Sequence, residues 1–551
     1  MEGVRPYTEE QIRKYRKWWL NTTINDAFDR TCDIQPNKEA LVEGKQRLTF
    51  AQVREQTHKA ALALLELGVR PGSFVLFQLP NWAESVPIYL GLKKIGAIPV
   101  LLLPRHGQRE LDRFCNLTEP LAWIGPAAYE RMDYLPILKG LQAKHPSLQQ
   151  ILVVRDEAPA GTVSFSRLME SAKVDENTPD YLAQFSPSPD DIIHMAPTGG
   201  TTGLPKLVPK TQNQHLCKAY YFMRHLEMGH DEVPMSCLPL THDAPHLFSL
   251  CVWTLFGGKL VLCPSTRPKD ILEHVQKERV TFFFSVPTLL ADILNEPELA
   301  KYDLSSLRSF LCAAAHVEPE LVKAAADKLK VCVHTGYGST EGAGCFTRRN
   351  DPLEVVATTY GRGMCAYDEY WIVDEEGKQL PQGQEGEIAV RGPSVVTGYY
   401  KSEAENSEVF TSDGFYHTGD IGKLDQWGNI MVMGRKKDII RRGADSISPA
   451  EIEDLLVGHP KVLRAAVVGM PDKRLGERVC AYLQLKAGET AALEEIVSWL
   501  KAQGASVMML PERLEVLDAL PLSAFDKVDK KKLKENITQK LLREGEDGKP
   551  S

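Results

Sequence analysis

Strand-like and helix-like segments alternate from about residue 40 to 345 of this 551-residue chain, and no other feature limits its fold as strongly. Apolar residues recur at helical spacing in segments such as 50–67 and 319–329. Between such segments lie short apolar runs typical of buried strands, at 74–78, 98–103, 151–154 and 260–263. The alternation predicts an α/β fold with largely parallel sheets, because helices connect parallel neighbours.

The chain is too long for one ordinary hydrophobic core, so we expect two or more domains. From about 368 to 432 the pattern changes to short strands separated by Gly/Asp turns, which predicts a β-rich subdomain. Helix and strand patterns resume after the polar cluster Gly434–Asp438. We therefore place a domain boundary at Lys437, with a large domain over 1–436 and a small one over 437–551.

Composition excludes several classes of function. The net charge is −8, and no general basic field favours a nucleic-acid partner. The two most apolar stretches, 85–104 and 247–264, are interrupted by lysines or glycines, so neither predicts a membrane span. The eleven cysteines show no CxxC pair, and the N-terminus has no apolar signal region. We expect a cytoplasmic protein with free thiols.

The nonapeptide TGGTTGLPK, Thr198–Lys206, follows a strand-like run at 192–196. Its glycines allow successive N–H groups to face one anion, and its threonines and lysine add further donors. It is not the common nucleotide loop, because Leu204 and Pro205 separate Gly203 from the lysine. The segment predicts a polyphosphate site. Its residues are Thr198, Gly199, Gly200, Thr201, Thr202, Gly203 and Lys206.

Two further motifs carry carboxylates beside hydroxyl groups or strand ends. In Tyr337–Glu341 a Ser-Thr pair precedes a glutamate, a set of oxygen ligands that suits Mg²⁺. In Tyr416–Asp420 the aspartate can accept hydrogen bonds from a ribose diol. Taken alone, each motif is equally well explained as a turn with an exposed charge or an Asx turn.

The last two motifs lie beyond the expected boundary. In Gly443–Glu453 a loop leads into a helix, with Ser448 as N-cap, Pro449 at the first helical position and Glu451 placed for a capping box. The other motif is the segment Pro521–Lys530. It overlaps the basic run Lys527–Lys534, whose simplest explanation is a solvated helix start.

In this order the five motifs resemble those of the adenylate-forming superfamily, which includes acyl-CoA and aryl-CoA ligases, aryl-acid–AMP ligases, peptide-synthetase adenylation domains and luciferases. The resemblance spans residues 198–530. It implies a large N-terminal domain of stacked, mostly parallel sheets and a small, mobile α+β C-terminal domain. It also implies that ATP and Mg²⁺ activate a carboxylic acid as its adenylate, with release of pyrophosphate, before transfer to a thiol.

The resemblance assigns roles to individual residues. Tyr337 would pack on adenine, and Ala314 and Ala315 would lie on the other side of the base. Gly338 would line the nucleotide and acid sites. The expected phosphate and magnesium contacts are Thr340 and Glu341, and the expected ribose contacts are Asp420 and Arg435.

In the C-terminal domain, Lys527 would be the catalytic lysine, acting with Thr198, Lys206 and Glu341. Asp526 replaces the glycine usual before that lysine. Lys437 would be the hinge about which the domain turns. Gly443 would line the pantetheine tunnel for CoA, although Ala444 stands where many relatives have a second glycine.

The acid pocket is predicted from the segment Leu240–His246. It lies where 2,3-dihydroxybenzoate enzymes carry a His-Asn pair, and here the pair is His242 and Asp243. Phe248 falls where that group has a small serine, so a ring hydroxyl would lose a partner. We expect a plain aryl or alicyclic acid, such as benzoate or cyclohexene- or cyclohexanecarboxylate. A core position for Phe248 is the competing interpretation.

The acceptor and the role of Asp243 stay open at this stage. The segment Ile447–Glu453 favours CoA, and a carrier protein acting in trans is the second choice. An amino acid whose ammonium binds Asp243 ranks third. An unpaired buried carboxylate beside a neutral acid is costly, so a neutral acid requires either that His242 supplies a charged partner or that Asp243 turns away from the pocket. A nucleotide-binding regulator without catalysis is the non-enzymatic alternative, and retention of residues such as Lys206 and Glu341 argues against it.

Overall fold

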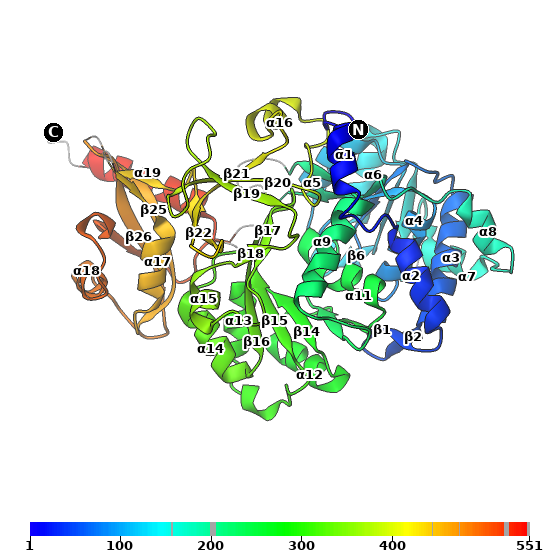
Figure 1. Cartoon of the computed structure of the whole chain (residues 1–551), viewed down its shortest axis with the longest axis horizontal. Coiled ribbons are helices and arrows are strands. Elements are labelled where there is room, and N and C mark those ends of the chain that lie inside the picture. The colour runs from blue at the N-terminus through cyan, green and yellow to red at the C-terminus, as the bar shows by residue number, and fades with distance from the viewer. Residues whose placement is uncertain (156–157, 199–204, 443–444, 473, 523–527, 548–551) are drawn as a thin grey trace.

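The fold is described from a computed structural model that covers all residues except 156–157, 199–204, 443–444, 473, 523–527 and 548–551. In Figure 1 the chain begins in the larger part of the molecule on the right and centre. The elements that follow residue 437 form a smaller part on the left. The expected mixed α/β fold with parallel sheets is confirmed.

Sheet I is the larger of two mainly parallel sheets. Its central strands run parallel, and antiparallel pairs close both edges. In spatial order its described strands are β18 (Arg362–Gly363), β17 (Gly344–Phe346), β16 (Cys332–Gly338), β15 (Ser309–Ala313), β14 (Phe282–Ser285), β12 (Pro234–Ser236), β13 (Leu260–Leu262), β1 (Glu39–Glu43) and β2 (Gln46–Thr49).

Sheet II is parallel except for the edge pair that flanks the predicted phosphate loop. Its described strands are β11 (Leu207–Thr211), β10 (Ile192–Pro197), β4 (Ile98–Leu101), β3 (Phe74–Phe77), β5 (Ala122–Gly125), β8 (Gln150–Val153) and β9 (Val163–Ser164). A separate hairpin is formed by β6 (Ala128–Tyr129) and β7 (Met132–Asp133).

Helices cover these sheets and join their strands. Several begin with a capping box, in which a threonine and the side chain three residues later satisfy free backbone N–H groups. Those before residue 360 are α1 (Glu9–Tyr15), α2 (Ile24–Ile34), α3 (Phe50–Glu66), α4 (Ser85–Lys94), α5 (Gln108–Thr118), α6 (Leu135–Lys144), α7 (Phe165–Ser171), α8 (Thr178–Ala183), α9 (Gln212–His225), α10 (Asp243–Pro245), η1 (His246–Cys251), α11 (Val252–Phe256), α12 (Pro268–Glu278), α13 (Pro287–Leu294), η2 (Leu299–Lys301), α14 (Pro319–Leu329) and α15 (Leu353–Thr358).

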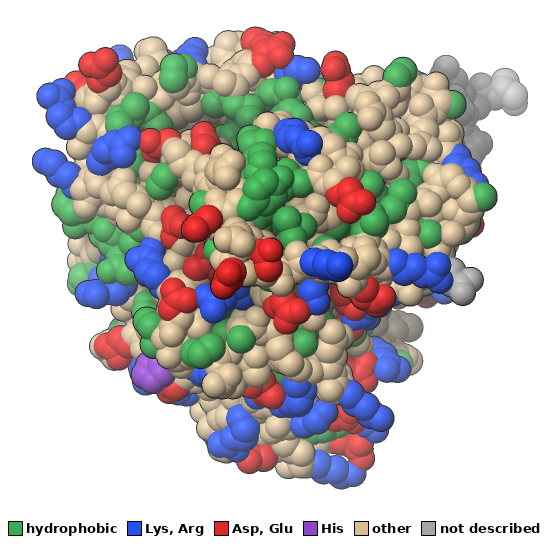
Figure 2. Space-filling view, turned by 90° about the vertical axis from the view of Figure 1, so that its right-hand side faces the viewer, with side chains coloured by type: hydrophobic (Ala, Val, Ile, Leu, Met, Phe, Trp, Pro, Cys, Tyr) green, Lys and Arg blue, Asp and Glu red, His purple; other side chains and the backbone are tan. Residues whose placement is uncertain are grey.

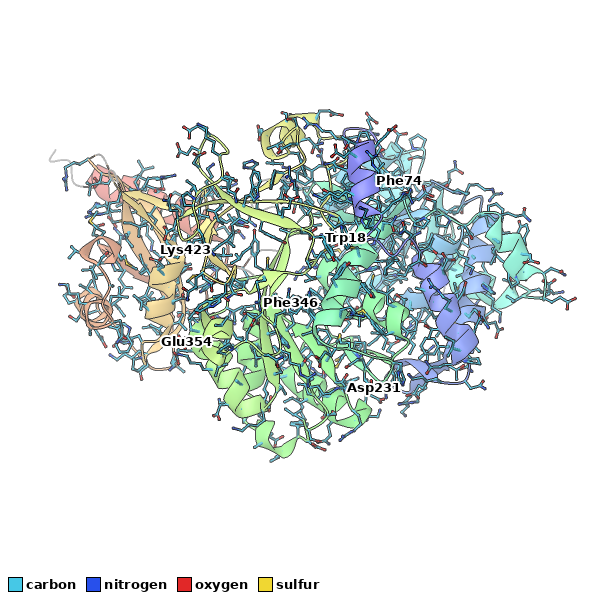
Figure 3. All side chains as sticks on the ribbon, in the orientation of Figure 1. Trp18, Phe74, Asp231, Phe346, Glu354 and Lys423 are labelled. Carbon is cyan, nitrogen blue, oxygen red and sulfur yellow. The ribbon has the colours of Figure 1, made fainter. Side chains whose placement is uncertain are left out.

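The core is layered because side chains alternate across each strand. In β3, Val75 and Phe77 belong to the central cluster with α3, α4 and α9, whereas Leu76 faces the cluster with α5 and α6. Figure 3 shows Phe346 at the centre of the molecule, where its ring lies 5.0 Å from that of Phe222. Strands buried on both faces read as continuous apolar runs, which is the pattern seen in the sequence.

Two smaller sheets follow. Sheet III is antiparallel, and its described strands are β19 (Glu369–Val373), β20 (Gly386–Arg391), β21 (Tyr416–Leu424) and β22 (Ile430–Arg435), with α16 (Glu403–Val409) beside it. Sheet IV contains β23 (Ile440–Arg442), β24 (Asp445–Ile447), β25 (Val462–Asp472), β26 (Gly476–Leu485) and β27 (Arg513–Val516). It is accompanied by α17 (Pro449–Val457), α18 (Leu493–Ala502), η3 (Val507–Met509) and α19 (Lys530–Asp547).

The surface carries charges of both signs. Figure 2 shows the face at the right of Figure 1, on which basic and acidic side chains are intermixed. Within the described part of the chain, no helix combines the length and the apolar character needed to cross a membrane. All eleven cysteines are free thiols, as the sequence predicted.

Candidate active site

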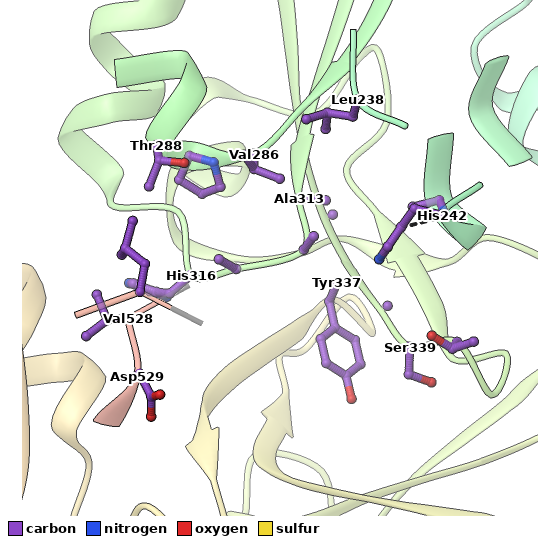
Figure 4. Close-up of a pocket in the computed structure, with 18 of the residues that line it drawn as sticks. Leu238, His242, Val286, Thr288, Ala313, His316, Tyr337, Ser339, Val528 and Asp529 are labelled. Atoms are coloured by element: carbon purple, nitrogen blue, oxygen red, sulfur yellow. Dashed lines mark hydrogen bonds between the residues drawn. The ribbon is translucent and has the colours of Figure 1, made fainter. Parts of the chain in front are cut away.

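A cavity of about 2480 Å³ lies between sheets I and III and the C-terminal elements. Described residues from all five motifs line it, and Figure 4 shows a part of the wall. The predicted site residues on this wall are Thr198, Lys206, His242, Asp243, Phe248, Ala314, Ala315, Tyr337, Gly338, Thr340, Glu341, Arg435 and Lys437. Predicted residues as far apart in the chain as Thr198 and Lys437, a separation of 239 positions, thus share one site.

Three of the predicted nucleotide residues are joined directly. The Tyr337 hydroxyl donates to Asp420 Oδ2 at 2.7 Å, and Arg435 Nε lies 2.8 Å from Asp420 Oδ1. Strand pairing brings Asp420 opposite Arg435 between β21 and β22. Asp420 is almost fully buried, whereas half of the Arg435 side chain is exposed. The arrangement places an aromatic ring, a carboxylate and a guanidinium where a nucleoside could be bound.

The adenine-side segment has an unusual backbone. Ala314, which follows β15, adopts a positive φ of 74°, a conformation that side chains other than glycine rarely take. Such strain persists only where the surrounding structure enforces it, and it is common at ligand sites. The turn brings both Ala314 and Ala315 to the cavity wall.

The expected magnesium ligand has a partner that the sequence did not suggest. Tyr399 donates its hydroxyl to Glu341 Oε1 at 2.6 Å, and its ring lies 4.6 Å from Lys206 Nζ. Tyr399 therefore fixes a carboxylate and an ammonium beside each other. Glu341 and the hydroxyls of Thr198 and Thr340 offer hard oxygen ligands on one wall, a donor set that fits Mg²⁺ held with a polyphosphate.

The base of the phosphate loop is closed by two hydrogen bonds. The Thr198 backbone N–H donates to the Lys206 carbonyl at 2.9 Å, and the Lys206 N–H donates to the Thr198 hydroxyl at 3.1 Å. The loop thus begins and ends at adjacent points beside the cavity. The residues inside it, Gly199, Gly200, Thr201, Thr202 and Gly203, lie outside the described residues, as do Gly443 and Lys527.

Phe248 belongs both to the acid pocket and to the hydrophobic core, the two interpretations that the sequence left open. It lies on the π-helical turn η1, is 6% exposed, and packs against Phe222 and Phe284 at centroid distances of 4.6 and 5.2 Å. It also lines the cavity, together with Leu247 and Met364. The phenyl ring is therefore a core side chain with one edge on an apolar pocket.

Asp243 faces a buried polar cluster behind this pocket. Its Oδ2 lies 3.7 Å from Lys210 Nζ, and its Oδ1 lies 3.7 and 3.9 Å from His194 Nε2 and His215 Nδ1. Burial alone would raise the pKa of Asp243, but the Lys210 charge and the nearby His194 imidazole hold that pKa well below its usual range. The sequence offered His242 as the charged partner, whereas in the structure Lys210 takes this position.

Three buried histidines in this cluster could offer a nitrogen each to a metal ion. Ring nitrogens of His194, His215 and His246 lie within 4.8 Å of one another. The ammonium groups of Lys210 and Lys218 beside them oppose a cation, however, and burial lowers the pKa of Lys218 to about 8. We therefore interpret the cluster as the polar back wall of the acid pocket.

The structure thus adds residues that sequence reasoning missed. Tyr399, Lys210, Lys218 and His316 carry no motif of their own, and only their neighbours in space reveal them. Lys210 and Lys218 lie close to the phosphate loop in sequence, on β11 and α9, but a lysine there is most simply interpreted as a surface residue.

The comparisons with known proteins agree with this geometry. A family model described as AMP-binding enzyme matches residues 28–400, and one described as AMP-binding enzyme C-terminal domain matches residues 451–527. The chain is 32% identical over 548 residues to the 2,3-dihydroxybenzoate-AMP ligase of Bacillus subtilis (strain 168), covering 98% of this chain and 99% of that relative.

One further relative is named as a CoA ligase, and another has a known structure. A 2-hydroxy-7-methoxy-5-methyl-1-naphthoate–CoA ligase of Streptomyces carzinostaticus is 33% identical over 541 residues, covering 97% of this chain and 96% of that relative. The apo structure of MbtA from Mycobacterium smegmatis superposes with a TM-score of 0.73 at 29% identity, covering 97% and 98% of the two chains. The chain belongs to the AMP-binding enzyme family, and hence to the adenylate-forming superfamily of ATP-dependent ligases.

Replacing Asp420 with alanine should raise the KM for ATP about tenfold and change kcat less. The substitution removes the acceptor shared by Tyr337 and Arg435, and hydrogen bonds to a charged group contribute about 1.5–3 kcal/mol. Initial rates at varied ATP would measure the effect. Tyr337→Phe is the matched control, because it removes one hydrogen bond and keeps the ring. An unchanged KM in Asp420→Ala would contradict a role in ribose binding.

Replacing Phe248 with serine should shift the relative kcat/KM towards 2-hydroxy- or 2,3-dihydroxybenzoate. The change opens space and offers a hydrogen-bonding group, which can alter discrimination by about 1–3 kcal/mol. Because the ring is packed in the core, we also expect a loss of about 3 kcal/mol in the free energy of unfolding.

Phe222→Ser is the control for this pair of effects. Phe222 belongs to the same aromatic cluster but not to the residues that line the cavity. Urea denaturation should show a similar loss of stability in both variants, whereas only Phe248→Ser should change acid preference. If the preference of the Phe248 variant is unchanged, the pocket assignment is wrong and the ring acts only in the core.

Proposed function

We propose that this protein is an AMP-forming acid–CoA ligase for an aryl or alicyclic carboxylate of the benzoate or cyclohexene- or cyclohexanecarboxylate type. The acid carboxylate attacks the α-phosphate of ATP, and pyrophosphate leaves with its Mg²⁺. The CoA thiol then attacks the acyl carbonyl, and AMP leaves. Loading of a separate carrier protein with a hydroxybenzoate is the alternative.

One observation carries this proposal: the nucleotide residues and an apolar pocket share a single cavity. Tyr337, Asp420 and Arg435 form one end of the nucleotide site, and Lys206 with Glu341 forms the other. The adjoining pocket, with Phe248 in its wall, can accommodate an apolar ring next to the reacting phosphate. Retention of these side chains, in two sets of contacts around one cavity, argues for catalysis and against a regulator that only binds nucleotide.

The Lys210 contact with Asp243 argues against an amino-acid substrate. A substrate ammonium bound to Asp243 would have to displace a buried lysine that already lies 3.7 Å away. Displacing it would leave that lysine buried without a counter-charge, which is strongly unfavourable. The carboxylate is thus occupied by the protein itself, and a neutral ring in front of it needs no charged partner.

Support for CoA comes from sequence and relatives together. The segment Ile447–Glu453 resembles that of acyl-CoA ligases, and one relative of 33% identity is named as a CoA ligase. Other relatives are named as AMP ligases, including the Bacillus subtilis protein. We favour CoA on the resemblance of the segment Ile447–Glu453, since Phe248 bears on the acid and not on the acceptor.

An ATP/pyrophosphate exchange screen over aryl, alicyclic, fatty and amino acids tests the proposal. We expect exchange with plain ring acids to exceed that with hydroxybenzoates and amino acids. Thioester formation should then be measured with CoA and with an aryl carrier protein. Absence of exchange with every acid would support the non-catalytic alternative. If transfer to the carrier protein is faster than transfer to CoA, the carrier protein and not CoA is the acceptor.

A further inference from the structure

A histidine in the wall of the cavity forms a hydrogen bond between the two parts of the molecule. His316 follows the Ala313–Ala315 turn of the larger part, and its Nε2 is hydrogen-bonded to Oδ1 of Asp454 on α17. Because a carboxylate only accepts hydrogen bonds, Nε2–H is the donor. The other ring nitrogen, Nδ1, lies 2.9 Å from the Tyr360 hydroxyl, which also accepts from the Val317 N–H at 3.3 Å.

The contact fixes the imidazole from both sides. Tyr360 is 8% exposed and is anchored to β22 through its own N–H, which donates to the Ile430 carbonyl at 2.8 Å. His316 keeps about a third of its side chain exposed (32%), and Asp454 keeps 27%. A long-range hydrogen bond made by a side chain that is already held is more favourable than one between free surface groups, since less conformational entropy is lost.

The helix that receives this contact also holds the segment that flanks the predicted catalytic lysine. Glu453, next to Asp454, lies 2.7 Å from Lys530 Nζ at the first residue of α19. Leu522 pairs with Val528 as an isolated bridge, and both line the cavity. Figure 4 shows Val528 and Asp529 beside His316 and facing the same space as Tyr337. An uninterrupted set of contacts therefore runs from His316 through α17 to the start of α19.

A second hydrogen bond, made by Ser448, also joins the C-terminal part to the larger part of the molecule. The structure confirms Ser448 as the N-cap residue and Pro449 at the first helical position, but the capping box that the sequence allowed with Glu451 is not formed. Ser448 makes no side-chain cap to α17, and its hydroxyl donates instead to the Met433 carbonyl in β22. The helix start is thus bound to the larger part of the molecule, which explains why the expected capping bond is not formed.

We propose that His316 is a positioning residue: its hydrogen bond to Asp454 holds the C-terminal part in the orientation that serves adenylation. The assignment rests on the proposed function for its catalytic meaning, but its structural content does not depend on which acid is used. Breaking the contact should release this orientation and leave the site of each reaction intact.

The charges around His316 make the contact sensitive to pH. Burial lowers the pKa of His316, but the hydrogen bond and charge of Asp454, together with Glu318 and Glu453, raise that pKa above its usual value. Lys530 offsets part of the Glu453 charge, and the Tyr360 hydroxyl faces Nδ1 of the His316 ring. A raised pKa means that protonation favours this orientation. Its contribution is complete at low pH and is lost as the pH rises through the pKa of His316.

The experiment separates the two half-reactions in His316→Ala, Asp454→Ala and the double variant. Acid-dependent pyrophosphate release reports adenylation, and CoA thioester formation from a supplied acyl-adenylate reports transfer. We expect adenylation to fall about 5- to 10-fold in each single variant, without a matching fall in transfer. The double variant should be no worse than either single one, because both remove the same interaction. His316→Gln, which can still donate, should restore part of the rate.

A second readout needs no substrate. Trypsin cleavage of the apo protein in the 436–442 connection should accelerate several-fold in His316→Ala, and wild-type protein should be cleaved faster at pH 8.5 than at pH 6.5. A peptide substrate corrects for the pH dependence of trypsin. His145→Ala is the matched control, since His145 bonds Asp112 at 2.8 Å within the larger part alone.

The outcomes are distinct. Equal loss of both half-reactions, additive effects in the double variant, or unchanged cleavage in His316→Ala would each overturn the assignment. If no acid supports pyrophosphate release, the proposed function fails, and the cleavage experiment still decides whether His316 holds the two parts together.

Discussion

Replacing Lys527 with alanine should slow acid-dependent adenylation by roughly 10²–10³-fold, while thioester formation from a supplied acyl-adenylate should change far less. A cation at this position would bridge the acid carboxylate and the α-phosphate as charge develops between them, and losing one such preorganised contact has an effect of this size. The described residues on either side of the segment 523–527, Leu522 and Val528, line the cavity.

The measurement compares the two half-reactions in one variant. Lys531→Ala is a suitable control, because Lys531 also lines the cavity and its side chain is more than half exposed. We expect the control to retain most of the adenylation rate. Equal loss of adenylation and transfer in Lys527→Ala would mean that the lysine acts in folding or binding and not in the adenylation step.

Local pattern was sufficient to predict most of the fold. The apolar runs at 74–78 and 260–263 became β3 and β13, and the segment 319–329 became α14 with the expected bounds. These elements can be predicted because the sequence of each one is itself a short apolar run or a periodic pattern. The shift to Gly/Asp-punctuated strands near residue 368 likewise predicted sheet III, because antiparallel neighbours are joined by tight turns.

The contacts that tune the site could not be predicted in this way. Tyr399 and Glu341 are 58 residues apart, and His316 and Asp454 are 138 apart, so no local period links them. Their meeting depends on the order of strands in each sheet and on the placement of α17. A lone tyrosine or histidine in a sequence is most simply explained as packing, and only the partner in space changes that interpretation.

Asp243 shows the same limit from the opposite side. The sequence identified the residue and the cost of burying it, but it offered His242 and not Lys210 as the charged partner. The structure provides it from β11, where Lys210 reads as one polar residue in an edge strand. Energetic reasoning therefore predicted that a partner must exist, and the topology of sheet II determined which residue it is.

Replacing Lys437 with proline should reduce adenylation by roughly 10²-fold or more and leave thioester transfer mostly intact. Lys437 is the third residue of a turn closed by the Asp438 N–H, which donates to the Arg435 carbonyl at 2.9 Å. Proline is disfavoured at this position because it forces the preceding residue out of the helical region.

The penalty for a proline that does not fit its backbone is about 3 kcal/mol, which corresponds to roughly a 10²-fold change in the population of this orientation. If Lys437 is the hinge, the loss falls on the half-reaction that needs the orientation seen here, in which Leu522 and Val528 face the cavity. Lys437→Ala is the control, since it removes the side chain without fixing φ. Wild-type rates for both half-reactions in Lys437→Pro would place the hinge at another residue of the connection between β22 and β23.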